Sequence, residues 1–235
     1  MMPAATMATE GKPGDSAEFM AKRGEFAAGA RGAIPNSSRV HGALDDAGIA
    51  FAGAKSRFGA VMKLVRWTRF TWDLAKLPGE GCALGEHYHI RPVARDEEKT
   101  VRAVIASSFA LDMNWSDTLK TMKDWLESRL AAVFEHKTAP CLVVTHGTRI
   151  IGASALDVNR DAECHLVSGP CILNEYRNRG IGSELLFQSL SALREGGFET
   201  ARAITKSNVP IAKFVYTKFN SVAEPWEFEL ALARS

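Results

Sequence analysis

The segment from Arg177 to Gly182 combines residue types and a spacing that suit the binding of a phosphate group. Arg177 and Arg179 are positively charged. Gly180 and Gly182 lack a Cβ atom, so the backbone can turn tightly and a ligand can approach it closely. A helical pattern begins at Ser183, and the unpaired N–H groups and dipole of a helix start attract anions. The spacing therefore predicts a phosphate or pyrophosphate site, although a plain strand-to-helix turn would need the same glycines.

The segment is not a Walker A loop, since GxxxxGK[ST] is absent, and it is not a dinucleotide fingerprint, since it holds a single GxG. Its sequence, RNRGIG, resembles instead the R/Q-x-x-G-x-G/A acyl-CoA signature of the GCN5-related N-acetyltransferase (GNAT) superfamily. The preceding run, Ile172 to Tyr176, is similar to the family's V-x-P-E-Y, with Asn174 in place of proline. The residues that resemble the family's N…A…Y-x-K-x-G-F block are Asn208, Ala212, Tyr216, Lys218 and Phe219. Asn220 replaces the glycine of that block, and Ser221 replaces its aromatic residue.

The resemblance covers residues 86–235 and implies the acyl-CoA N-acyltransferase fold, of the α/β (α+β) class. In that fold, helices flank a mixed central sheet that splays between its fourth and fifth strands, and acyl-CoA lies in the gap. The pyrophosphate meets the amides of the loop, and the pantetheine arm pairs with the preceding strand. The cofactor-binding residues implied in this way are Ile172, Leu173, Arg177, Asn178, Arg179, Gly180, Ile181, Gly182, Ser183 and Asn208. Acetyl-CoA is the expected cosubstrate, and no metal is expected.

Candidates for proton transfer follow from the same resemblance. Tyr216 stands where the family places a tyrosine near the CoA sulfur, and a phenol there can donate a proton to the thiolate. Packing in the core is the alternative for this tyrosine. Glu163 and His165 alternate along a predicted strand, which would put both on one face as candidates for the base. The alternative is a polar pair at an exposed strand start. Cys171 is interpreted as a buried thiol, because no residue is placed to activate it.

The expected activity is the transfer of an acyl group from acyl-CoA, acetyl-CoA above all, to an amine of a small molecule or a protein. A catalytically weak acetyl-CoA-binding regulatory or scaffolding module is the alternative. In a third interpretation, Met1 to Lys76 is an arm that binds nucleic acid or a partner. The acceptor pocket is expected to form from the first two helices, their connection Leu111 to Asp117 and the hairpin near His146. Trp115 and Trp125 could line that pocket or fill the core.

Hydrophobic periodicity predicts the elements that must position these residues, in the order β, α, α, β, β, β, α, β, α, β. Strands are predicted at Tyr88–Val93, Cys141–Thr145, Arg149–Leu156, Cys164–Leu173, Ala201–Thr205 and Trp226–Leu232. Helices are predicted from Asp96, from a cap at Ser116, over Glu184–Arg194, and over Val209–Phe219 with Asn208 as cap. Trp, Thr and Phe over residues 65–74 favour an edge strand or an extended arm.

Composition divides the 235 residues into three parts. Residues 1–61 are rich in Ala and Gly, which predicts a low-complexity, disordered segment. The chain from Met62 looks like a natural start, so residues 1–61 are hypothesised to be an over-extended start. Residues 62–85 are expected to be an extended arm or edge strand, and residues 86–235 the acyltransferase domain.

Charge and cysteine content restrict the partners and the compartment. The formal net charge of +2 argues against a strongly basic nucleic-acid binder. No apolar run is long enough to span a membrane, no secretory signal is evident, and the four cysteines form no CxxC pair. We therefore expect a cytoplasmic protein that acts on an amine without nucleic-acid or membrane partners, and a homodimer stays open.

Overall fold

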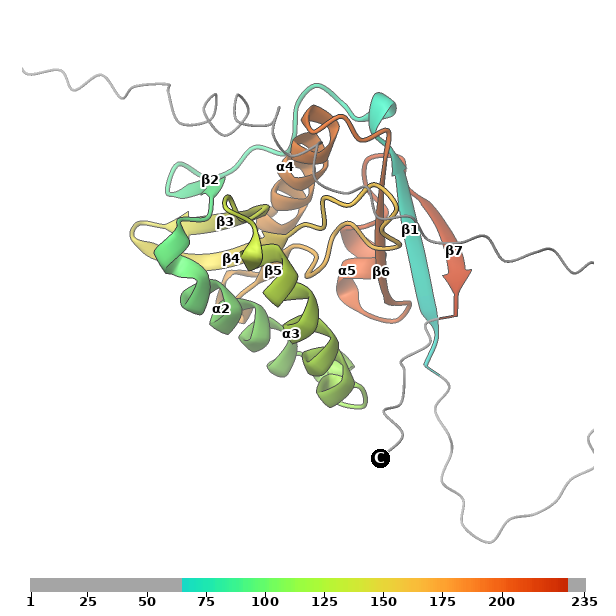
Figure 1. Ribbon diagram of the computed structural model, residues 1–235, viewed down its shortest axis with the longest axis horizontal. Helices are drawn as coiled ribbons and strands as arrows, with labels where there is room; N and C mark the ends of the chain where they lie inside the picture. The colour runs from blue at the N-terminus through green and yellow to red at the C-terminus, as the bar shows by residue number, and fades with distance from the viewer. Residues whose placement is uncertain (1–64, 228–235) are drawn as a thin grey trace, which may run out of the picture.

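The computed structural model describes residues 65–227, which form two antiparallel sheets with helices packed on them (Figure 1). The first sheet has the strand order β2-β3-β4-β5. Its strands are β2 (Tyr88–Pro92), β3 (Cys141–His146), β4 (Arg149–Ala155) and β5 (Cys171–Ile172). The second sheet has the order β6-β1-β7. Its strands are β6 (Thr200–Lys206), β1 (Trp67–Asp73) and β7 (Val222–Trp226). The predictions for residues 1–61 lie outside the described residues.

The helices connect and cover these strands. The α-helices are α2 (Glu98–Ala110), α3 (Leu119–Glu135), α4 (Ile181–Glu195) and α5 (Pro210–Phe214). The 3-10 helices are η2 (Leu74–Lys76), η3 (Arg95–Glu97), η4 (Met113–Trp115) and η5 (Asn174–Tyr176). Among residues 65–227, none of the helices has the length and apolar content that a membrane crossing requires.

Side chains of β3 alternate between two apolar clusters on opposite faces of the first sheet. Cys141 and Val143 pack with the buried faces of α2 and α3. Leu142 and Val144 pack with Ile181 and other residues at the start of α4. This alternation follows from the two-residue period of a strand. The first sheet therefore lies between the α2–α3 pair and α4, and β5 is held directly against the first turn of α4.

The two sheets part between β5 and β6. These are the fourth and fifth strands counted from β2, so the predicted position of the splay is confirmed. The sheets are joined near Arg202 of β6, whose carbonyl oxygen accepts hydrogen bonds from the backbone N–H groups of His165 and Leu166 at 2.8 and 3.1 Å. Beyond this junction the chain turns at Gly169, which has a φ of 63° and whose N–H donates to the carbonyl of Leu166 at 3.2 Å. The described strands pair only in antiparallel ladders in two sheets, whereas one mixed sheet was expected.

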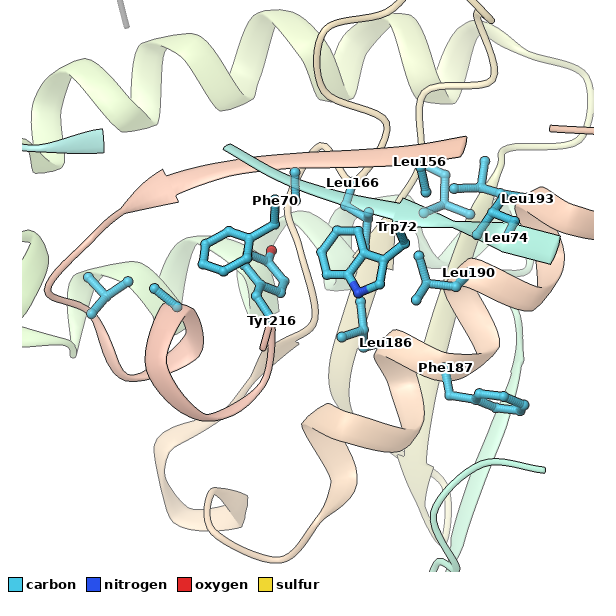
Figure 2. Close-up of a cluster of buried hydrophobic side chains, with 14 of the residues drawn as sticks. Phe70, Trp72, Leu74, Leu156, Leu166, Leu186, Phe187, Leu190, Leu193 and Tyr216 are labelled. Carbon is cyan, nitrogen blue, oxygen red and sulfur yellow. The ribbon is translucent and has the colours of Figure 1, made fainter. Parts of the chain in front are cut away.

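The expectation of an arm or edge strand over residues 65–74 is wrong. β1 is the central strand of the second sheet, because it pairs with β6 on one side and with β7 on the other. Two of its aromatic side chains stand opposite alanines: Phe70 pairs with Ala203, and Trp72 pairs with Ala201. Such large-with-small pairs leave room for the rings, and in Figure 2 Trp72 lies near Leu186 and Leu190 of α4, while Phe70 lies beside Tyr216. The folded domain therefore includes β1, and a boundary at residue 86 divides a sheet.

Most predicted elements are present, and four differ in extent or capping. The second helix is preceded by Thr118 at its N-cap position, while the Ser116 hydroxyl donates to the carbonyl of Met113. The predicted strand Cys164–Leu173 is irregular except for β5. α5 is short and has Val209 at its N-cap, so Asn208 is not the cap. The last strand, β7, begins earlier than predicted, and the residues beyond 227 lie outside the description.

Candidate active site

A cavity of about 430 Å³ opens where β5 and β6 part. It receives residues from both sheets, from the loop before α4, and from the helices α2, α3 and α5. The predicted site residues that line it are Ile172, Arg177, Asn178, Gly180, Gly182, Ser183 and Tyr216. The predicted site residues outside its lining are Leu173, Arg179, Ile181, Asn208, Glu163 and His165. The structure thus brings most of the loop and Tyr216 to one cavity, although they are separated in sequence.

The loop before α4 presents unpaired backbone N–H groups. Asn178 and Gly180 adopt left-handed conformations, with φ of 62° and 79°. The N–H groups from Asn178 to Gly182 donate to no atom of residues 65–227. Those of Ser183 and Glu184, by contrast, donate to the carbonyl of Gly180 at 3.0 and 3.2 Å. A run of unpaired amides at a helix start forms a concave site for an anion.

The space beside Gly182 fits a bulky anionic group. A Cβ atom at this position would meet only the Ile172 side chain, at 3.8 Å. A Cβ atom at Gly180 would meet nothing within 4 Å. The residues present therefore fit the pyrophosphate of an acyl-CoA, because open space and unpaired donors coincide here.

Arg177 is engaged by the protein and is not a free cation for a ligand. Its guanidinium donates to the carbonyls of Ile172 and Ser108, at 3.2 and 2.7 Å. It also pairs with the Asp112 carboxylate at 3.0 Å. Arg177 therefore holds the loop against the end of α2, and the positive charge that the sequence places here is paired with Asp112.

Arg179 points away from the cavity. Its guanidinium donates to the Tyr88 hydroxyl and to the carbonyl of Glu175, both at 3.0 Å. The side chain is exposed and does not line the cavity.

β5 is an edge of the first sheet. Cys171 and Ile172 pair with Ala153 and Gly152 of β4, and no strand within the described residues pairs on the other side of β5. Part of that outer edge is used, since the carbonyl of Ile172 accepts from Arg177. An extended ligand arm could still add to this edge, as the resemblance implies for pantetheine.

Tyr216 lies in the turn after α5 and is buried. Its ring packs against Phe70 and Trp72, with centroids 5.3 and 5.5 Å away, as Figure 2 shows. A Cβ atom at position 169 would collide with the Tyr216 hydroxyl, so Gly169, with φ of 63°, leaves room for it. Burial raises the pKa of Tyr216 well above its usual value. The phenol is therefore neutral at physiological pH and can act as a proton donor but not as a base.

Glu163 and His165 are not brought together at the cavity. Glu163 is exposed, whereas the His165 side chain is 1 % exposed. His165 Nδ1 accepts from the backbone N–H of Arg202 at 3.0 Å, and burial lowers the pKa of its imidazole. The segment is irregular, so the strand alternation that would place both side chains on one face does not apply.

Cys171 lines the cavity as a protonated thiol. Its Sγ donates to the carbonyl of Ser168 at 3.3 Å, and burial raises its pKa to about 12. A thiol in this state is a weak nucleophile, because the thiolate is the reactive form. The interpretation as a buried thiol agrees with this environment.

A second part of the cavity lining, from β1, α2, η4 and α3, consists mainly of large apolar side chains. They are Trp67 of β1, Phe109 of α2, Trp115 of η4, and Met122 and Trp125 of α3. Both tryptophans named in the sequence thus line the cavity, although Trp115 also packs in the core. His146 does not line it. Trp67 was not predicted to line the cavity, because residues 65–74 were expected to be an edge strand or an extended arm. Phe109 was not predicted to line it, because its spacing in α2 is that of core residues.

Two ion pairs fasten the connection between α2 and α3 to both sheets. Asp112 pairs with Arg177 after β5, and Asp117 pairs with Lys206 of β6 at 2.5 Å. The Lys206 side chain is only 2 % exposed. Burial acts to raise the pKa of Asp112, but hydrogen bonds from Asn114 and the charge of Arg177 outweigh it and lower the pKa. The hydrogen bond from Lys206 is the main cause that lowers the pKa of Asp117.

Comparisons with known proteins relate this geometry to a family. The model described as "Acetyltransferase (GNAT) family" matches residues 106–220. The fold is similar to that of a GCN5-related N-acetyltransferase from Sphaerobacter thermophilus, with a TM-score of 0.50 and 14% sequence identity, over 68% of this chain and 49% of that chain. The mixed α/β architecture implied by the sequence is thereby confirmed.

Two further solved structures are similar at lower scores. One is a tandem GNAT protein from the clavulanic acid biosynthesis pathway, with a TM-score of 0.47 and 12% identity over 69% of this chain and 51% of that chain. The other is a Drosophila protein, with a TM-score of 0.47 and 12% identity over 69% of this chain and 50% of that chain. The chain spans about half the length of these structures. No curated protein matches it significantly.

Proposed function

The chain belongs to the acetyltransferase (GNAT) family, and on this premise we propose that it transfers an acyl group, in the simplest case acetyl, from acyl-CoA to an amine. The family generally uses acetyl-CoA as its cosubstrate. The observation that carries the proposal is the run of unpaired N–H groups from Asn178 to Gly182, on the same cavity as the Tyr216 phenol.

The donor wall, defined here as residues 172–183, would hold the cosubstrate. Its unpaired amides and the positive end of the α4 dipole would bind the pyrophosphate. The outer edge of β5 would bind the extended arm. Arg177 would act indirectly, because its three hydrogen bonds fix the loop in the conformation that exposes the amides.

In the proposed reaction an N–C bond forms and a C–S bond breaks. The amine nitrogen attacks the thioester carbon, the C–S bond breaks, the nitrogen loses one proton and the sulfur gains one, so the products are an amide and a free thiol. Tyr216 is the proposed proton donor to the sulfur, because its buried phenol is protonated and lines the cavity. Positioning of the reactants would supply much of the remaining acceleration.

Glu163 and His165 are not proposed as the base, since neither lines the cavity. Asp112 lines it but is a poor base, because its lowered pKa and its pairing with Arg177 stabilise the carboxylate. The amine must then lose its proton without the help of Glu163, His165 or Asp112 before it attacks the thioester.

Calorimetry and a turnover assay test the proposal together. Acetyl-CoA should bind the folded chain, and a release of free thiol should depend on an added amine. Absence of binding heat and of any shift in melting temperature with acetyl-CoA would refute the proposal.

A further inference from the structure

The cavity lining contains an aromatic chamber, defined here as Trp67, Phe109, Trp115, Met122 and Trp125. The ring centroid of Trp115 lies 4.9 Å from that of Phe109 and 6.2 Å from that of Trp67. The rings thus form one continuous surface contributed by β1, α2 and η4. Rings and a thioether offer dispersion contacts to an apolar body and few hydrogen bonds to a polar one.

The charged groups near the aromatic chamber are already paired. The Asp112 carboxylate accepts from Arg177 and from Asn114. The Lys206 ammonium lies 5.7 Å from the Trp115 ring centroid, but Lys206 does not line the cavity. Its ammonium donates to the Asn114 carbonyl at 2.6 Å and pairs with Asp117. A second charge on an acceptor would therefore lose its hydration without gaining a free partner here, which disfavours its binding.

Lys218 is the remaining charged residue of the cavity lining within residues 65–227. It is exposed and follows α5, on the side of Tyr216 and Phe214. An anionic group that reached Lys218 would remain in solvent and outside the aromatic chamber.

Three exposed apolar side chains belong to the cavity lining or lie next to it in sequence. Leu111 and Met113 flank the lining residue Asp112, and they are 62% and 84% exposed. Phe214, 69% exposed, lines the cavity from α5. Apolar side chains gathered at a cavity edge are typical of a surface that receives an apolar ligand.

We infer that the acyl acceptor is a primary amine on an uncharged apolar body, aryl-alkyl or alkyl, which fills the aromatic chamber. This inference rests on the proposed acyltransferase function. The chamber also accounts for the missing base: burial in an apolar environment disfavours the ammonium form, so an amine that enters loses its proton to water. The neutral nitrogen then carries the lone pair that attacks the thioester.

Two matched pairs of amines test the inference with the full chain and acetyl-CoA. Phenethylamine and phenylalanine share a ring and differ by a carboxylate, while hexylamine and 1,6-diaminohexane differ by a second amine. The uncharged-body member of each pair should have a kcat/KM higher by about tenfold or more. Equal or higher kcat/KM for the charged members would overturn the inference and leave the acyltransferase function standing.

Binding of acetyl-CoA without acetylation of any of the four amines would overturn the inference as well. Absence of acetyl-CoA binding would instead refute the proposed function itself, so the two failures are distinguishable.

A pair of tryptophan variants locates the acceptor. Trp125 and Trp226 are both half-buried and each has an arginine over its ring, but only Trp125 lines the cavity. Trp125→Ala should lower kcat/KM for phenethylamine about tenfold, while Trp226→Ala and the acetyl-CoA Kd of both variants should stay near wild type. Equal activity of the two variants would overturn the assignment. If Trp125→Ala does not fold, Trp125→Leu gives the same comparison.

Discussion

The two walls of the cavity present different parts of the chain to a ligand. The donor wall offers backbone N–H groups from Asn178 to Gly182, while its arginines make hydrogen bonds to the protein. The acceptor wall, residues 109–125 with Trp67, offers aromatic side chains. Backbone amides are the same for every amino acid, so they suit a group that every cosubstrate carries, such as a pyrophosphate. Side chains differ between amino acids, so substitutions in a site made of side chains can adapt it to a different acceptor. If the proposed function holds, cosubstrate and acceptor specificity would therefore be separable.

Tyr216→Phe tests the proposed proton donor, which belongs to neither wall. Loss of the phenol proton should lower kcat about a hundredfold, with little change in the Kd of acetyl-CoA, because the ring packing with Phe70 and Trp72 is kept. Steady-state kinetics and calorimetry provide the measurements. Tyr176→Phe is the matched control, since Tyr176 also lines the cavity. An unchanged kcat in Tyr216→Phe would leave Tyr216 with a packing role only.

Arg177→Met tests whether one side chain holds the two walls together. The variant removes the hydrogen bonds to Ile172 and Ser108 and the ion pair with Asp112. We expect the free energy of unfolding, measured in urea, to fall by about 2 kcal/mol.

Arg179→Met is the control, because it removes the same charge from an exposed side chain. Its free energy of unfolding should change by about 0.5 kcal/mol or less. Equal losses in the two variants would argue against a specific role of Arg177.

Gly182→Asp tests the backbone character of the donor wall. The space beside Gly182 is open, so the variant should fold, but its carboxylate would repel a pyrophosphate. The affinity for CoA should fall about tenfold, which corresponds to about 1.4 kcal/mol, as measured by calorimetry. Gly79→Asp adds the same charge where a Cβ atom meets nothing, and it should bind CoA normally. Normal affinity in folded Gly182→Asp would place the pyrophosphate elsewhere.

The pH dependence of stability reports on the pairing of Asp112 with the loop. The pKa of this carboxyl is lowered in the folded chain, so its contribution to stability is complete above its unfolded pKa, about 3.9, and is lost as pH falls through the folded value. Wild type should therefore exceed Asp112→Asn by about 1 kcal/mol in unfolding free energy at pH 7, and by less below pH of about 4. Urea titrations at several pH values provide the measurement, and a difference that does not vary with pH would contradict the assignment.

The sequence by itself determined the local conformation of the loop before α4. Left-handed turns and an open helix start depend on neighbouring residues, so the spacing of Gly180 and Gly182 was sufficient to predict a tight strand-to-helix turn, while the binding of an anion there stays a prediction. The α2–α3 pair and the β3–β4 hairpin were predictable for the same reason, because their hydrophobic periods are local.

Only the tertiary structure decided which distant residues meet. β1 lies in the centre of the second sheet, where Phe70 and Trp72 stand opposite alanines of β6. In this position the ring of Trp67 lies beside that of Trp115. The same packing left Glu163 and His165 outside the cavity, since the segment between β4 and β5 is not a regular strand. Contacts between residues far apart in sequence depend on how the sheets and helices pack against one another. Local hydrophobic periodicity predicts which face of an element is buried, but it does not determine which other element packs on that face.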